Sequence, residues 1–281
     1  MLVRTYCPPL PLADYVTYFW YMRGYAPSHH KELSIPDGGA VDLVFDLKEP
    51  TIRLWDADNK PHHLSHSILC GPHTRHFVID TLSQSPTCAP SEVAGIRFKP
   101  GGARAFLGAT SLALRDQLLS LDGLWGSEAG ELREELRLSD TPEEKFLAME
   151  RRLLARHGQW LLKQRRGDNH GAAVSHALER LKRDSVGVVV DGVGMSHRRF
   201  NEIFQGEVGL SPKRYARMIR FQQALHLLGS GMEVDWTGLA IDCGYYDQAH
   251  FIKEFRSFSG LSPTSYTPIA GRHSNHTPVR A

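Results

Sequence analysis

The sequence contains few cysteines, and none of them form a pair with metal-binding spacing. Its four cysteines, Cys7, Cys70, Cys88 and Cys243, are scattered along 281 residues without a CxxC motif. This distribution disfavours a zinc ribbon, and it also disfavours the disulfide framework of a small secreted domain. We therefore expect each cysteine to be a small buried thiol.

Long apolar runs are also missing. No run approaches the roughly 20 residues that a membrane-spanning helix needs, and the N-terminal stretch MLVRTYCPPLPLADYV lacks the order of regions found in a signal peptide. The apolar content of 41% and charged content of 23% are typical of a globular protein with a proper core. We therefore expect a cytoplasmic protein without a membrane partner, with enough residues for two domains.

Patterns typical of catalysis and cofactor binding are absent as well. The stretch PGGAR at 100–104 lacks the lysine of a phosphate-binding loop, so a turn between a strand and a helix is the better interpretation. His73 and His76 are three residues apart and would face opposite sides of a strand. The other histidines of this half do not form the HxH pattern with a following Glu that metal-binding β-barrels use; they are His29, His30, His62, His63 and His66. We predict no enzyme activity, no cofactor and no metal site.

The first hundred residues have the pattern of β-strands. The stretch AVDLVFDL at 40–47 alternates apolar and acidic residues, which is the two-residue period of a strand. Further strands are expected at 16–23, 51–55, 66–70, 76–80 and 93–98, and together they favour an antiparallel barrel or sandwich. The aromatic residues of these strands suit a core, or alternatively an effector pocket; they are Tyr18, Trp20, Phe45 and Trp55.

After residue 100 the pattern becomes helical, which gives an α+β fold. Thr141 is a candidate helix cap followed by Pro142 and two glutamates, and Phe146, Met149 and Leu153 then recur at helical spacing. This stripe favours packing within the chain over a dimer seam. We predict a β domain at 1–110, a helical linker or dimerisation segment at 111–168, a helical domain at 169–268 and a disordered tail at 269–281.

An internal repeat with an offset of 51 residues dominates the helical domain. Seven residues recur in order, with Phe200, Phe204, Gly209, Leu210, Ser211, Pro212 and Tyr215 matching Phe251, Phe255, Gly260, Leu261, Ser262, Pro263 and Tyr266. In each copy a glycine, Gly194 or Gly244, suits a tight turn between two helices. The second helix of each copy would bury its phenylalanine pair and present a polar opposite face. This arrangement is that of a helix-turn-helix, whose second helix lies in the DNA major groove.

The outward positions of the two second helices are the candidate base-reading residues. Arg198 suits guanine, and Asn201 or Gln248 suits adenine. The full candidate set is His197, Arg198, Asn201, Glu202, Gln248, Ala249, His250 and Lys253. Candidate phosphate contacts, which position a protein without reading sequence, are Ser196, Lys213, Arg214, Arg217, Arg220, Arg256 and Thr264. From His170 onward, 13 Lys/Arg stand against 10 Asp/Glu, so this part is mildly basic.

The stretches GYYDQAHFIKEFRSFSGLSPTSY and VGMSHRRFNEIFQGEVGLSPKRY resemble the helix-turn-helix signature of AraC/XylS-type bacterial transcription regulators. The resemblance implies two such units in residues 170–268, joined by a long helix from Pro212 to about Leu228, with double-stranded DNA as partner. Segments such as YVTYFWY and SIPDGGAVDLVFDL look like the cupin-like sensory domains of some relatives. That likeness implies a β-barrel for an unknown small-molecule effector, and it leaves room for a homodimer and for contacts with RNA polymerase.

Two features depart from this pattern or compete with it. The first helix of the first unit, SVGVVVDGVG at 185–194, contains glycines and valines with weak helix propensity, which favours distortion there. A regulator that acts mainly through protein contacts, without a ligand, is the alternative function. DNA-repair methyl acceptors that carry a similar helical domain are disfavoured, because the sequence has neither a PCHR-type nucleophile motif nor a cysteine cluster for zinc.

Overall fold

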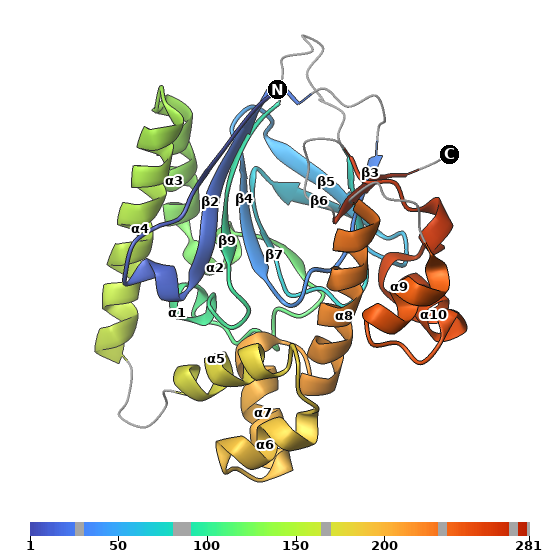
Figure 1. Cartoon of the computed structure of the whole chain (residues 1–281). Coiled ribbons are helices and arrows are strands. Elements are labelled where there is room, and N and C mark those ends of the chain that lie inside the picture. The colour runs from blue at the N-terminus through green and yellow to red at the C-terminus, as the bar shows by residue number, and fades with distance from the viewer. Residues whose placement is uncertain (26–30, 81–90, 164–169, 230–234, 270–274, 280–281) are drawn as a thin grey trace.

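The computed structural model describes residues 1–25, 31–80, 91–163, 170–229, 235–269 and 275–279. Its N-terminal part contains two antiparallel sheets, and helices form the rest of the chain (Figure 1). This is the predicted α+β class, and the predicted strands are present with ends that differ by a residue or so. The strands form two sheets rather than one closed barrel.

The first sheet has six strands in the order β1, β2, β9, β4, β7, β10, with bounds Leu2–Tyr6, Val16–Arg23, Glu92–Phe98, Val41–Asp46, Ser67–Cys70 and Leu118–Ser120. The second sheet has five strands in the order β11, β3, β8, β5, β6, with bounds His276–Pro278, Lys31–Ser34, Phe77–Asp80, Thr51–Trp55 and Pro61–Ser65. A small apolar cluster that includes Leu54, Ile68 and Phe77 joins the two sheets. We call the surfaces that meet there the inner faces.

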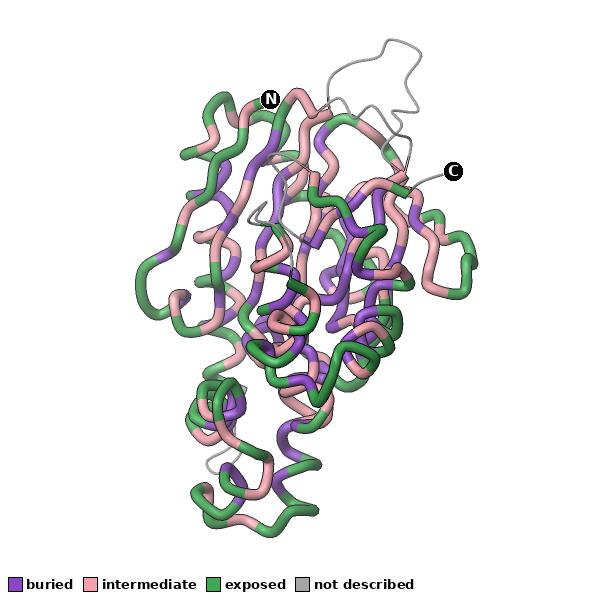
Figure 2. The backbone as a smooth tube through the Cα atoms, turned by 45° about the vertical axis from the view of Figure 1, so that its right-hand side comes forward, coloured by how far each residue is buried: buried purple, intermediate pink, exposed green. Residues whose placement is uncertain are grey.

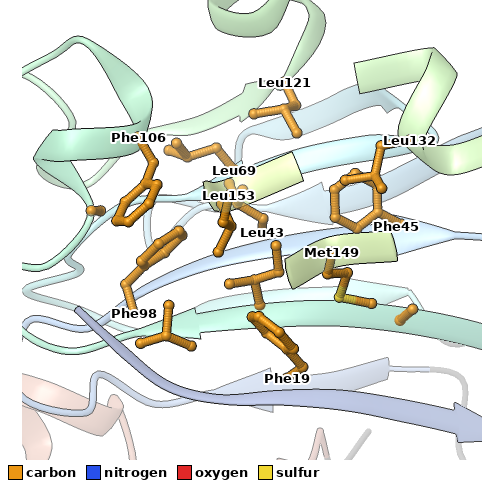
Figure 3. Packing of buried hydrophobic residues seen from close by; sticks show 14 of the residues in the cluster. Phe19, Leu43, Phe45, Leu69, Phe98, Phe106, Leu121, Leu132, Met149 and Leu153 are labelled. Atoms are coloured by element: carbon orange, nitrogen blue, oxygen red, sulfur yellow. The ribbon is translucent and has the colours of Figure 1, made fainter. Parts of the chain in front are cut away.

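The opposite face of the first sheet packs against four helices. These are α1, α2, α3 and α4, with bounds Arg104–Leu107, Asp122–Trp125, Ser127–Leu138 and Pro142–Lys163. Phe19, Leu43 and Phe45 are fully buried in this core, and Met149 and Leu153 of α4 lie among them (Figure 3). The stripe Phe146/Met149/Leu153 is therefore intramolecular packing, which agrees with the prediction.

The start of α4 follows from its sequence. The Glu144 backbone N–H donates to Thr141 Oγ1 at 3.2 Å, and the Thr141 N–H donates to Glu144 Oε2 at 3.1 Å. This reciprocal pair is a capping box, which satisfies backbone donors that the first helical turn leaves without partners.

The C-terminal part contains α5, α6, α7, α8, α9 and α10, with bounds Gly171–Arg180, Val186–Val193, His197–Val208, Pro212–Gly229, Trp236–Asp242 and Gln248–Ser259. Two short 3-10 helices, η1 at Leu12–Asp14 and η2 at Pro263–Ser265, complete the described elements. The helices share a second core, which also takes in Leu33 and Ile35 at the end of β3. The second sheet and the helical domain are thus packed together, and the tube in Figure 2 shows buried segments in both parts.

The last described strand departs from the expectation of a disordered tail. His276–Pro278 form β11, which pairs antiparallel with β3, with Thr277 opposite Leu33. Thr277 is buried, and the amide of Asn275 donates to the Ile35 carbonyl at 2.9 Å. The C-terminal segment therefore returns to the β domain, because β3 offers an edge with unpaired backbone groups.

Three sequence expectations concern cysteines, metals and membranes. Cys70 and Cys243 are buried as predicted, but Cys7 is exposed beyond the end of β1; Cys88 lies outside the described residues. Within the described ranges, no group of three or more His, Cys, Asp or Glu is placed to hold a metal ion, and His29 and His30 fall outside them. The helices of the same ranges include none long and apolar enough to cross a membrane.

Candidate nucleic-acid interface

The first of two similar units consists of α6, a turn and α7. Gly194 ends α6 with a φ of 71°, a left-handed conformation that side chains disfavour. Ser196 then caps α7 by accepting the Arg199 N–H at 3.2 Å. Although its sequence favoured distortion, α6 is an α-helix, and the burial of Val189 and Val190 in the second core compensates for weak propensity.

The second unit, α9, a turn and α10, repeats this plan. Gly244 follows α9 with a φ of 74°, and Asp247 caps α10 by accepting the His250 N–H at 2.7 Å. Asp235 caps α9 through the Thr237 N–H at 3.1 Å. Both second helices end at glycines with left-handed backbone, Gly209 and Gly260.

The helix α8 joins the two units and has the predicted bounds. Its 18 residues correspond to about 27 Å at 1.5 Å per residue. Successive turns of one DNA groove are about 34 Å apart, so a helix of this length suits the spacing of two recognition helices. The Ser211 hydroxyl caps α8 by accepting the Arg214 N–H at 3.2 Å.

Each second helix has one buried and one exposed face. Phe200 and Phe204 of α7, and Phe251 and Phe255 of α10, are almost fully buried. The exposed positions are His197, Arg198, Asn201 and Glu202 on α7 and Gln248, Ala249 and Lys253 on α10. The structure therefore places seven of the eight predicted base readers at the surface, and the eighth, His250, is half-buried.

Arg198 is almost fully exposed, with 91% of its side chain accessible. Its Nε donates to Glu202 Oε1 at 3.0 Å, one helical turn away. An exposed pair of this kind contributes little stability, so the guanidinium is free to exchange Glu202 for a base edge.

His250 is tied to its own turn. Its ring packs edge-on against Tyr245 with centroids 5.5 Å apart, and its Nδ1 accepts the Tyr246 N–H at 3.4 Å. The side chain thus braces the turn before α10, which reduces its freedom to read a base.

The predicted phosphate contacts divide into two groups. Ser196, Lys213, Arg256 and Thr264 are exposed. Arg214, Arg217 and Arg220 are instead bound by protein groups: Arg214 donates to the Thr74 carbonyl at 3.3 Å, and Arg220 to the Gly244 carbonyl at 3.3 Å. The phosphate role of these three arginines stays a prediction, and the structure adds that each of them has a partner within the protein.

Arg217 forms a bidentate ion pair that joins two helices of the helical domain. Two of its nitrogens donate to Glu254 of α10, at 2.7 and 2.5 Å, and the Glu254 side chain is only 9% exposed. Burial by itself raises the pKa of Glu254, but the hydrogen bonds and charge of Arg217 outweigh burial and lower it overall. This bidentate pair therefore joins α10 to α8 and helps to fix the orientation of α10.

The four predicted effector residues do not converge. Tyr18 and Trp20 lie on the inner face of the first sheet, because Trp20 covers Gly95, where a Cβ would come within 2.4 Å of the indole. Phe45 points to the opposite face, among the helices (Figure 3). Trp55 lies on the outer face of the second sheet, under the Lys31 ammonium. Only Tyr18 and Trp20 thus remain candidates for one pocket.

The same inner face carries a charged group that the sequence did not single out. Arg97 of β9 stands opposite Tyr18 in the sheet register, and its Nη1 donates to Asp42 Oδ2 at 2.9 Å. The two side chains are 17% and 23% exposed, whereas Leu43 and Ile96 on the other face are fully buried. Solvent therefore reaches the polar inner face but not the helix-covered core.

Two family models match the chain. Residues 189–268 match a family described as a helix-turn-helix domain, and residues 4–120 match one described as a domain of unknown function (DUF6597). Together they fall on the helical domain and on the N-terminal sheets.

Relatives of known sequence match about a quarter of the chain. An uncharacterised HTH-type transcriptional regulator of Haemophilus influenzae is 38% identical over 72 residues, which are 26% of this chain and 24% of that protein. The HTH-type transcriptional activator RhaS of Escherichia coli is 35% identical over 75 residues, 27% of each chain. The chain thus spans about a quarter of the length of the curated relatives it matches.

Solved structures are similar at low identity. ToxT of Vibrio cholerae has a TM-score of 0.47 and 14% identity, with 88% of this chain and 97% of that chain covered. A probable AraC family transcriptional regulator of Rhodopseudomonas palustris has a TM-score of 0.30 and 26% identity, with coverage of 33% and 91%.

Proposed function

We propose that residues 189–268, which match a helix-turn-helix domain family, form an AraC-type DNA-binding domain, and that the chain is a sequence-specific DNA-binding transcription regulator. The proposal rests chiefly on one observation: α7 and α10 each carry an exposed polar face over a buried phenylalanine pair. Two such helices joined by α8 suit successive major grooves on one side of double-stranded DNA.

In this proposal the readers are Arg198 and Asn201 of α7 and Gln248 and Lys253 of α10, with His197, Glu202 and Ala249 beside them. Lys213, Arg256, Ser196 and Thr264 provide phosphate contacts, which fix the register. Contacts with RNA polymerase remain part of the proposal.

The test is binding of the full chain to DNA from upstream of its own coding sequence, measured by fluorescence anisotropy at modest salt with competitor DNA. A double variant, Arg198→Ala with Lys253→Ala, should weaken specific binding by at least about 30-fold. The matched control, Arg75→Ala with Lys60→Ala, removes two exposed positive charges from the second sheet region and should leave it unchanged. Undiminished binding by the first variant would favour a regulator that acts through protein contacts.

We further propose that the inner faces of the two sheets hold a small-molecule effector. Tyr18 and Trp20 offer aromatic surface there, beside Arg97 and Asp42, and these side chains are only partly buried. Because a ligand stabilises the folded state alone, a thermal-shift screen of metabolites should give hits that raise the melting temperature. Trp20→Ala should abolish such a shift, whereas Trp55→Ala, on the outer face, should preserve it.

The helical segment at 111–168 is also the proposed site of a homodimer. Leu147, Leu154 and Leu161 recur every seven residues on the exposed face of α4, with exposed fractions of 51%, 40% and 53%. A seven-residue apolar repeat is typical of helix pairing. Leu154→Glu should convert a dimer to a monomer in light scattering, and an unchanged mass would remove α4 from the proposal.

A further inference from the structure

The segment between β3 and β4 touches both the inner face and the helical domain. Residues 35–39, Ile-Pro-Asp-Gly-Gly, which we call the coupling loop, place a charged side chain against the first sheet and their backbone against α8. Among the described residues, this loop carries a side chain that pairs with a residue of the inner face. The backbone next to that side chain contacts α8 directly.

On the sheet side, the contact is an ion pair between Asp37 and Arg97. The guanidinium of Arg97 also pairs with Asp42, which belongs to β4 itself. One cation therefore holds two carboxylates, one in the rigid sheet and one on the coupling loop. The side chains of Asp37 and Asp42 are 20% and 23% exposed, so a difference in burial does not make one ion pair stronger than the other.

On the helix side, the contacts come from backbone atoms of the loop. Gln222 Nε2 donates to the Pro36 carbonyl at 2.6 Å, and the Gly38 N–H donates to Met218 Sδ at 3.1 Å. Met218 and Gln222 are one helical turn apart and so lie on the same face of α8.

The two glycines allow this close fit. Gly38 and Gly39 have φ values of 98° and 86°, where any other residue would be strained. A Cβ on Gly38 would lie 3.3 Å from Ile219, and one on Gly39 would lie 3.2 Å from both Leu210 and Val208. The loop thus sits against the junction of α7 and α8, with little room for an independent movement.

We infer that α8 responds, through the coupling loop, to whether Arg97 is paired with Asp37. The loop thereby sets the relative placement of the two recognition helices. A ligand that binds at the inner face and displaces Arg97 from Asp37 breaks the ion pair that holds the loop on the sheet. The loop then loosens its backbone contacts with Met218 and Gln222. Because α8 also holds α10 through Arg217 and Glu254, the change reaches both units.

The consequence for regulation rests on the proposed function, whereas the mechanical link does not. If the loop couples the two sites, DNA binding must change the affinity for the inner-face occupant by the same factor as the occupant changes DNA affinity. The link itself is a property of the free chain, and it can be measured with neither DNA nor ligand present.

The test compares Asp37→Asn with Asp42→Asn by hydrogen exchange of the free full-length protein. Both variants replace one carboxyl partner of the same guanidinium, but only Asp37 belongs to the loop. We expect amides at 216–222 of α8 to exchange about three- to tenfold faster in Asp37→Asn and to stay near wild type in Asp42→Asn. Amides of α3 serve as an internal reference, because α3 contacts the other face of the first sheet.

Three outcomes would overturn the inference: unchanged exchange in α8, equal effects of the two variants, or acceleration that extends equally to α3. A second variant approaches from the opposite side. Gln222→Ala removes the hydrogen bond to Pro36 and should accelerate exchange at the Gly38 and Gly39 amides, and their full protection would also count against the loop.

Failure of this inference and failure of the proposed function are distinguishable. Faster exchange in α8 of Asp37→Asn, combined with no specific DNA binding by the wild-type chain, would support the coupling and reject the proposed regulator function. Specific DNA binding with no response of α8 to Asp37→Asn would do the reverse.

Discussion

The two helix-turn-helix units share a backbone plan but are held in different ways. The first carries an Arg–Glu pair on its exposed face, Arg198 with Glu202, whereas the second carries one at its base, Arg217 with Glu254. The first unit packs directly on the β domain, where Gly209 lies against Pro72 and the Ser111 N–H donates to the Gly206 carbonyl. The second unit contacts the β domain as well, because the His76 N–H donates to the Phe258 carbonyl at 3.1 Å and Gly260 lies against the His76 ring. The two units therefore differ chiefly in whether their Arg–Glu pair lies on the exposed face or at the base.

The largest difference should appear when each Arg–Glu pair is broken. Glu254→Ala leaves the Arg217 guanidinium partly buried without a carboxylate, so we expect the free energy of unfolding to fall by about 2–3 kcal/mol. Glu202→Ala breaks an exposed pair and should change it by less than about 0.5 kcal/mol. Urea denaturation of both variants measures the contrast, and equal losses would contradict it.

The ion pair between Arg217 and Glu254 should also make the stability of the chain depend on pH. Since the folded-state pKa of Glu254 is lowered, its stabilisation is fully present above the ordinary glutamate pKa of about 4.3. It is lost as the pH falls through the lowered value. Glu254→Gln should therefore flatten the acid side of the stability profile, measured by urea denaturation at a series of pH values.

The reading faces should differ in the affinity they contribute. Arg198→Ala removes a bidentate donor and should raise the dissociation constant for the specific site about 10- to 100-fold. Gln248→Ala removes a neutral amide, and we expect a smaller rise. Arg115→Ala, an exposed arginine of the other domain, is the control. Anisotropy titrations at one salt concentration decide the order, and a larger effect of Gln248→Ala would reverse the assigned roles.

The caps of the recognition helices offer a finer comparison. Asp247 accepts its helix N–H at 2.7 Å, and Ser196 does so at 3.2 Å. Asp247→Ala should cost about 1–2 kcal/mol of stability and Ser196→Ala about 0.5 kcal/mol, because the shorter bond involves a charged acceptor. Thermal melts read by circular dichroism measure both, and a greater loss at Ser196 would show that cap geometry is not what separates the units.

The smallest predicted effect concerns glycines in the first helices. Gly192 of α6 has open space where a Cβ would be, so Gly192→Ala should stabilise the chain by about 0.5–1 kcal/mol. At Gly238 of α9, a Cβ would come within 2.5 Å of the capping carboxylate of Asp235. Gly238→Ala should therefore bring no gain, and a similar stabilisation at both positions would contradict this account.

Sequence reasoning predicted elements whose signal is local. The strands at 16–23, 41–46 and 51–55 have strong alternation or β-branched and aromatic residues, and all appear in the structure. The strands β1, β3, β6, β10 and β11 were missed. Of these, KELS of β3 and HTP of β11 carry no periodic pattern; they pair with each other, and β3 also pairs with β8. The closed barrel that the sequence suggested is not formed, and a local pattern could not decide this, since closure depends on pairing between distant strands.

The same limit applies to the candidate interface. Exposed positions on α7 and α10 could be predicted, because helical spacing and buried phenylalanines define the opposite face. The roles of Arg214 and Arg217 could not, because Thr74 and Glu254 are remote in sequence from them. Asp247 could have been found as a cap from its place before the helix, whereas nothing local marks Arg97 as the partner of Asp37.

The pairing of β11 with β3 joins the last described segment of the chain to a strand near its beginning. The chain passes from the β domain to the helical domain and then returns to add one strand to the second sheet. A fragment that ends before the helical domain would lack β11 and expose both the edge of β3 and the apolar surface of Leu33 and Ile35. An N-terminal fragment produced without the helical domain should therefore aggregate. A peptide that spans 275–279 should pair with the exposed edge of β3 and reduce this aggregation.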